Sequence, residues 1–268
     1  MKRRDFIKNT ALTAGGLLLS GCIDRHELWD TLCEPIQPDA ISGLKLWLKA
    51  DAGITTATGV SNWADQSGNG NNATQGTGSS QPAFIASEPT LNNQAVVRFD
   101  GTNDFMTMPE FMNSSQPTLI IVGKSASGAS QRFFHDYGGV LYDREITIWY
   151  RFGLGYEFAI KDTSLNWISQ VNGSTLSYFI GTNIVIGTSI NVYYNGAMLS
   201  ASNAGYNTTT TWTTGPPPTL GKFSGSSTNY LNGDIAEIII YNNPISNADR
   251  LGVESYLSKK YGISVPCQ

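Results

Sequence analysis

The stretch INVYYNGAMLSAS, residues 190–202, decides the fold class because it carries the signals of a β-hairpin. Its first half combines the β-branched and aromatic residues that strands favour. Asn195 and Gly196 follow, and both residues tolerate the positive φ angles that a two-residue hairpin turn requires. The stretch therefore predicts two antiparallel strands joined by a tight turn.

The same signals recur along most of the chain, where short runs rich in β-branched and aromatic residues are separated by Gly, Asn and Ser. Three more Asn-Gly pairs, at 69–70, 172–173 and 232–233, indicate further turns. This spacing is typical of an all-β sandwich or barrel. The predicted strands, besides the hairpin, are 44–50, 94–100, 104–108, 117–125, 131–137, 140–143, 145–152, 156–161, 165–171, 176–182 and 233–242.

Two segments depart from this pattern. Residues 208–219, TTTTWTTGPPPT, predict a loop, because three consecutive prolines do not fit a central strand. Residues 246–262 predict a helix with Ser246 as N-cap and Asp249 completing a variant capping box. Gly262 is the expected stop. One apolar face of this helix, facing the sandwich, would consist of Val253, Tyr256, Leu257 and Tyr261.

The first 21 residues predict a targeting segment that is removed from the mature protein. A basic start is followed by a short apolar run, about half of the roughly 20 residues that a spanning helix needs. Residues 3–8, RRDFIK, resemble a twin-arginine export signal, and LSGC, ending at Cys22, resembles a lipobox. We expect lipid on Cys22; the alternative is an ordinary cleaved signal with an incidental cysteine. Ile23 after it favours the outer membrane in a Gram-negative cell.

The sequence is therefore predicted to divide into three regions: a signal peptide over 1–21, a lipid-anchored tether over 22–40 and one folded domain over 41–268. The whole chain has net charge −4, and removal of the signal leaves −7. After that removal no basic cluster exceeds Lys259-Lys260, so the composition argues against nucleic acid and against electrostatic adhesion to anionic lipid. Membrane contact is expected only through the anchor.

The order of several motifs resembles the laminin-G-like, concanavalin-A-like jelly-roll family of bacterial surface proteins. The resemblance covers about Ser42 to Val265 and rests on LKLWLKADAGI, VSNWADQSGNGNNATQ, AVVRFDGTNDFMTM, TLIIVGK, INVYYNGAML, LNGDIAEIIIYNNPIS and YLSKKYGI. It implies an all-β, two-sheet antiparallel jelly-roll β-sandwich with a short C-terminal helix. It also implies that the termini meet at one edge.

The cysteines other than Cys22 are Cys33 and Cys267, an even pair in an oxidising compartment. Because the resemblance brings the first and last segments together, we expect a Cys33–Cys267 disulfide. The two histidines, His26 and His135, lie far apart, and no Cys/His spacing suits zinc.

Residues 62–75, NWADQSGNGNNATQ, have two interpretations. As a turn, Trp63 closes the sandwich edge while Asp65 and Asn69 bond to nearby backbone. As a metal site, acids and amides near these turns supply oxygens to calcium. The candidate calcium ligands are Asp65, Asp100, Asn103 and Asp104. We favour the turn, since acids are sparse and no EF-hand-like run occurs.

The sequence contains no clear pattern of catalytic residues. Glycosidases of this sandwich class carry E-x-D-x-x-E on one strand, which this chain lacks. Asp143 and Glu145 lie two residues apart on a predicted strand and are interpreted as a solvated strand end. A serine–histidine–acid triad would need His135, whose aromatic neighbours indicate packing instead. We therefore predict no enzyme activity.

Carbohydrate binding is the function that the residues favour, because aromatic rings stack on sugars while amides and acids bond hydroxyls. On 146–152, Thr147, Trp149 and Arg151 share one face, opposite the apolar set. The function predicted is a non-enzymatic, carbohydrate-binding or other ligand-binding lipoprotein of the cell envelope. The alternative is a structural or adhesive protein-interaction domain, and a glycoside hydrolase comes third. The candidate ligand-binding residues are Trp149, Arg151, Trp167, Asn191, Tyr193 and Trp212.

Overall fold

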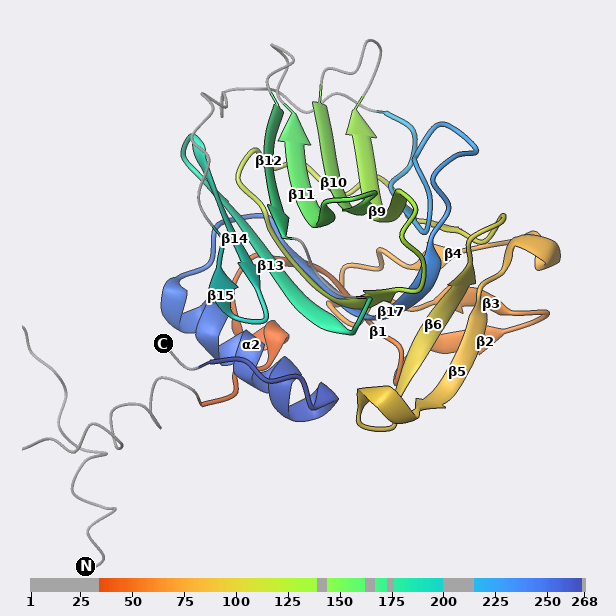
Figure 1. Cartoon of the computed structure of the whole chain (residues 1–268), viewed down its shortest axis with the longest axis horizontal. Helices are drawn as coiled ribbons and strands as arrows, with labels where there is room; N and C mark the ends of the chain where they lie inside the picture. Colours follow the sequence, from red (N-terminus) through yellow and green to blue (C-terminus); the bar gives the residue numbers. More distant parts are fainter. Residues whose placement is uncertain (1–33, 139–143, 162–166, 173–175, 200–214, 267–268) are drawn as a thin grey trace, which may run out of the picture.

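The computed structural model describes residues 34–138, 144–161, 167–172, 176–199 and 215–266. These residues form two antiparallel sheets stacked face to face with one C-terminal helix (Figure 1). The predicted jelly-roll β-sandwich is thereby confirmed. Among the described residues, no helix is long and apolar enough to span a membrane.

Sheet A contains the hairpin, the last strand of the chain and the strands that hold the site described below. Its last strand, β17 (Asn232–Tyr241), pairs with the first strand, β1 (Leu44–Lys49). Strands β6 and β1 follow one another along the same side of β17, because this ten-residue strand has room for both. In spatial order the other strands are β15 (Ala197–Met198), β14 (Ser189–Tyr194), β13 (Phe179–Ile186), β8 (Thr118–Ser125), then β17, β6 (Gln94–Asp100) and β5 (Ala83–Glu88).

Sheet B contains the strand that carries Trp149 and Arg151, two of the predicted ligand-binding residues. Figure 1 shows its strands β9 to β12 standing over β13 and β14 of sheet A. In spatial order the strands are β12 (Trp167–Asn172), β11 (Gly155–Lys161), β10 (Arg144–Arg151), β9 (Gln131–Gly138), β16 (Thr219–Leu220), β7 (Met106–Thr107), β4 (Ala73–Thr74), β3 (Val60–Trp63) and β2 (Ile54–Thr56).

The hairpin forms where the sequence predicts it. Tyr194 pairs with Ala197, and Asn195 and Gly196 have φ angles of 48° and 77°. Both central residues are left-handed, which is the geometry of a type I′ turn. The part of the predicted second strand beyond residue 199 lies outside the described residues, as does the predicted strand at 140–143.

Alternation along the strands divides each sheet into an inner and an outer face. The inner faces of both sheets form one apolar core, to which Leu48, Ile121, Ile148 and Ile238 belong. A second apolar cluster lies on the outer face of sheet A, beneath the helix.

Helix α2 (Asn247–Tyr261) is the predicted helix. The Ser246 hydroxyl accepts a hydrogen bond from the Asp249 amide at 3.1 Å, and Gly262 ends the helix with φ 68°. Val253, Leu257 and Tyr261 pack on the outer face of sheet A. The helix therefore covers part of the outer face of sheet A (Figure 1).

The end of the expected tether lies against this helix. Ile36 donates its amide to the Gly252 carbonyl at 3.0 Å, and a Cβ at Gly252 would lie 2.4 Å from the Ile36 side chain. Tyr241 donates its hydroxyl to the carbonyl of Pro38 in the 3₁₀ turn Pro38–Ala40. Two further 3₁₀ turns span Gly78–Ser80 and Pro89–Leu91.

Candidate ligand-binding site

A polar pocket lies on the part of the outer face of sheet A that carries charged instead of apolar residues. We call it the Arg98 pocket, defined by Glu88, Arg98, Lys124, Tyr178 and Asp234. Strand register brings three of these together, since Asp234 pairs with Arg98 on β6 and with Lys124 on β8. The other two lie at the end of β5 and just before β13.

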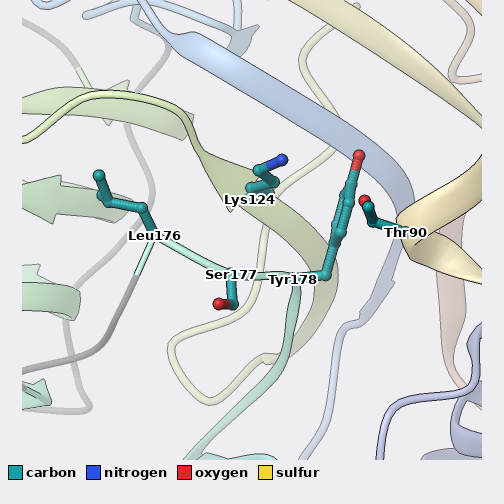
Figure 2. Close-up of a pocket in the computed structure, with 5 residues that line it drawn as sticks. All are labelled: Thr90, Lys124, Leu176, Ser177 and Tyr178. Carbon is teal, nitrogen blue, oxygen red and sulfur yellow. The ribbon is translucent and has the colours of Figure 1, made fainter.

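The pocket consists of two hollows that share Lys124. The larger has a volume of about 430 Å³ and also includes Glu88, Arg98, Asn232 and Asp234. The smaller, of about 250 Å³, is shown in Figure 2. Its lining consists of Thr90, Lys124, Leu176, Ser177 and Tyr178.

The acidic groups are held in fixed positions by Arg98. Its Nε donates to Asp234 Oδ1 at 2.7 Å, and its Nη2 donates to Asp234 Oδ2 at 2.9 Å and to Glu88 Oε2 at 2.7 Å. Tyr178 donates its hydroxyl to Asp234 Oδ2 as well. Bidentate arginine–carboxylate pairs impose specific geometry, so the pocket floor is organised before any ligand arrives.

Hydrogen bonds also set the ionisation of these groups. The Thr90 hydroxyl donates to Glu88 at 2.6 Å and, with Arg98, lowers the pKa of Glu88 to about 2 against the opposing effect of burial. Burial, followed by the bond to the Asp234 carboxylate, raises the pKa of Tyr178. At neutral pH the floor therefore presents charged Glu88 and Arg98 beside a neutral phenol.

Free donors and an apolar surface complete the pocket. The Lys124 amine forms no hydrogen bond or ion pair with any described residue and lies 5.1 Å from the centre of the Tyr178 ring. The Arg98 side chain is 41% exposed. Leu176 is 43% exposed beside them. A few placed polar groups beside apolar and aromatic surface are typical of small-molecule pockets.

Sequence reasoning missed this pocket. Arg98 and Asp234 are 136 residues apart, and each has apolar residues next to it in its strand. A charge on the solvent side of a strand is ordinary, and only strand register shows that the two are neighbours. The one local signal was that Arg98 interrupts the apolar run of QAVVRFD.

The predicted ligand-binding residues whose side chains the structure describes lie on two different sheets. Trp149 and Arg151 lie on the outer face of sheet B, where Trp149 is half-buried and the Arg151 side chain is 47% exposed. Asn191 and Tyr193 lie on β14 of sheet A, and the Tyr193 ring packs under Arg250 of α2 at 3.9 Å. Their roles in binding remain predictions.

Trp167 begins β12, and its backbone pairs with Lys161 of β11. Trp212 lies outside the described residues.

The loop 62–75 has the contacts of the turn interpretation. Trp63 is fully buried and donates Nε1 to the Lys49 carbonyl at 3.0 Å. Asp65 accepts from the amides of Trp47, Ser67 and Asn71 and from the Ser67 hydroxyl, at 2.7 to 3.0 Å. Its carboxylate thus joins the loop to β1.

Asn69 and the remaining candidate calcium ligands also bond within turns. Asn69 donates its side-chain amide to the Leu44 carbonyl. Asp100 accepts from the amides of Thr102 and Asn103, and Asp104 accepts from the Asp100 amide. No group of three or more His, Cys, Asp or Glu is placed to hold a metal ion in the part of the chain that the structure describes. Calcium binding remains a prediction.

His135 is fully buried on β9 with both ring nitrogens occupied. Nδ1 accepts from the Ser224 amide at 3.0 Å, so Nε2 carries the proton and donates to Glu145 at 2.9 Å. Burial lowers the pKa of His135, which keeps the ring neutral. The Phe223 ring lies 4.1 Å away. These contacts are those of a packed histidine, and Asp143 lies outside the described residues.

Known proteins resemble this chain in structure but not in sequence. No protein-family model and no curated protein matches the sequence. The binding domain of Paraclostridial Mosquitocidal Protein 1 is similar over 82% of this chain and 52% of its own length, with 13% identity and a TM-score of 0.58.

Two further structures are similar to the same degree. The botulinum neurotoxin serotype D binding domain has 13% identity and a TM-score of 0.59 over 82% of this chain and 52% of that one. Domain 4 of AbnA, a GH43 extracellular arabinanase from Geobacillus stearothermophilus, in complex with arabinotriose, has 15% identity and a TM-score of 0.56 over 80% and 97%.

This chain therefore spans about half the length of the toxin binding domains and nearly all of the arabinanase domain. Since each identity is below 20%, the likeness concerns the fold. The chain shares its β-sandwich fold with these toxin binding domains and with the arabinanase domain solved with arabinotriose.

Proposed function

We propose that this protein is a non-enzymatic carbohydrate-binding lipoprotein of the cell envelope and that it binds its glycan in the Arg98 pocket. The observation that carries the proposal is the preorganised floor of that pocket, in which Arg98 holds Asp234 and Glu88 beside the free Lys124 amine. A sugar presents hydroxyls that both donate and accept. Carboxylate lone pairs and the lysine amine are complementary to such a surface.

The similar structures support this class of ligand. The arabinanase domain was solved with arabinotriose, and a botulinum neurotoxin serotype D ligand-binding domain was solved with N-acetylneuraminic acid, at 14% identity to this chain. The proposed anchor is lipid on Cys22, which would hold the domain at a membrane, with the outer membrane favoured in a Gram-negative cell.

A glycan array with the purified full-length chain tests the proposal. Lys124→Met removes the free amine without breaking any bond to a described residue, so the fold should persist while glycan binding weakens. Lys259→Met is the matched control, because Lys259 is an exposed lysine on α2. Absence of binding to every glycan, or equal binding by the Lys124→Met variant, would exclude the Arg98 pocket as the glycan site. Release of reducing sugar from a bound glycan would show enzyme activity instead.

Protein binding is the second candidate, favoured by one observation. The turn between β10 and β11 exposes Phe152 by 74% and Leu154 by 41%. Exposed apolar residues at a turn are suited to contact with another protein. Cross-linking in intact cells that captures one specific protein and is lost in Phe152→Ser, with a blank glycan array, would favour this alternative.

A further inference from the structure

A second cluster of polar groups lies on the outer face of sheet B, away from the Arg98 pocket. Arg132 on β9 lies opposite Trp149 on β10, which lies opposite Glu157 on β11. The Arg132 guanidinium stacks on the Trp149 ring, 3.6 Å from its centre. The glycan proposal does not use this cluster.

The stacked pair contains buried donors that lack acceptors. Arg132 is only 6% exposed, and its Nε and Nη1 have no hydrogen-bond partner among the described residues. The Trp149 Nε1 is likewise buried without a partner. Buried polar groups in folded proteins are almost always hydrogen-bonded, since an unpaired buried donor costs about 1–3 kcal/mol and more when it is charged.

The nearby carboxylates do not supply the missing acceptors. Glu145 Oε1 accepts from His135 at 2.9 Å and forms an ion pair with Arg132 Nη2 at 3.8 Å, which is too long for a hydrogen bond. Glu157 is paired with Arg151 at 3.4 Å. Burial lowers the pKa of Arg132 to about 10, so the guanidinium is still charged at neutral pH.

We propose that Arg132 and Trp149 form a binding site for the carboxylate of an acidic ligand, separate from the Arg98 pocket. A carboxylate oxygen is an acceptor for these donors, and arginine binds it with short, charge-assisted hydrogen bonds. A monoanion suits the site better than phosphate or sulfate, because Glu145 and Glu157 repel a dianion more strongly.

Along β10 the exposure increases from half-buried Trp149 to Arg151, whose side chain is 47% exposed, and then to Phe152 at 74%. The carboxylate would bind at the Arg132 end, and the rest of the ligand would extend along β10 toward the β10–β11 turn. A uronic acid residue within a glycan has this shape and charge.

The Trp149 indole N–H reports binding directly in a ¹H–¹⁵N NMR spectrum of the full-length chain. Its cross-peak is identified by its loss in Trp149→Phe. Titration with sodium glucuronate should move this peak saturably, while glucose, the neutral match, should leave it in place. Replacing Arg132 by Lys keeps the charge and removes the planar fork, and it should weaken glucuronate binding at least about tenfold. Lys259→Met should bind glucuronate as the wild type does.

Three outcomes would overturn the carboxylate site. The peak could move equally with glucose, it could move with inorganic phosphate but not with glucuronate, or it could stay in place up to tens of millimolar glucuronate. The last result would mean that water, and not a carboxylate ligand, accepts the hydrogen bonds of the unpaired donors. If Arg132→Lys does not fold, the comparison of glucuronate with glucose on the wild type still decides. Because the readout is Trp149, failure here leaves glycan binding at the Arg98 pocket unaffected.

Discussion

Glu237 joins helix α2 to sheet A, and its replacement by Gln should cost the protein about 3 kcal/mol of folding free energy. The carboxylate is completely buried on β17. It accepts hydrogen bonds from Trp47 Nε1 at 2.6 Å, Tyr261 at 2.7 Å, Lys260 at 2.9 Å and Tyr256 at 3.2 Å. Three of these donors belong to α2, so one side chain orients the whole helix.

The magnitude follows from what Glu237→Gln leaves behind. The amide has nearly the same shape but no charge, and one of its two polar ends is a donor that faces other donors. Lys260, whose side chain is 12% exposed, would keep only Asp51 at 2.9 Å as a charged partner, and that carboxylate is 40% exposed. Breaking a buried ion pair costs about 3–5 kcal/mol. The remaining contact with Asp51 places the expected loss at the lower end of that range.

Urea unfolding of the wild type, Glu237→Gln, Lys260→Met and the double variant measures this loss and its origin. With a slope of about 3 kcal/mol per molar, the midpoint of Glu237→Gln should fall by about 1 M. The double-mutant cycle should give a coupling of about 1–3 kcal/mol. Lys259→Met, the exposed neighbour, should stay within about 0.5 kcal/mol of wild type. A loss below about 1 kcal/mol for Glu237→Gln, or no coupling to Lys260, would refute the role assigned to this carboxylate.

Three more predictions concern pH and the chain ends. Burial and the negative charge of Asp100 raise the pKa of Asp104 to about 6, so the folded state binds the extra proton and stability falls as pH rises from about 4 to 6. Asp104→Asn should remove this pH dependence of the folding stability and raise the stability at pH 7–8 by at most about 3 kcal/mol. If urea unfolding gives the same pH profile for the variant and the wild type, the prediction is wrong. Cys22→Ala should release the protein from the membrane fraction. A variant that stays in that fraction, together with a wild type that incorporates no labelled fatty acid, would contradict the lipid anchor. Cys33 and Cys267, which lie outside the described residues, should be disulfide-bonded, and mass spectrometry showing both thiols free would disprove the bond.

Features that depend on neighbours in the chain could be read from the sequence. The hairpin at Asn195-Gly196 and the caps of α2 at Ser246 and Gly262 are local, because the backbone angles and the capping bonds involve residues within a few positions. Most strands were predicted for the same reason, since a run rich in β-branched and aromatic residues, such as β8 or β17, is visible in one stretch. Strand β5, Ala83–Glu88, was missed because most of its residues are exposed and no apolar alternation marks it.

Features that depend on strand register required the tertiary structure. Alternation shows that Trp149 and Tyr193 lie on one side of their strands, but only sheet stacking places them on different outer faces of the sandwich, one beside Arg132 and the other under α2. The Arg98–Asp234 pair and the buried Glu237 likewise join residues that are distant in sequence. Which solvent-side charges become neighbours depends on the pairing order of whole strands, and that order is determined by the packing of the complete core and by no single segment.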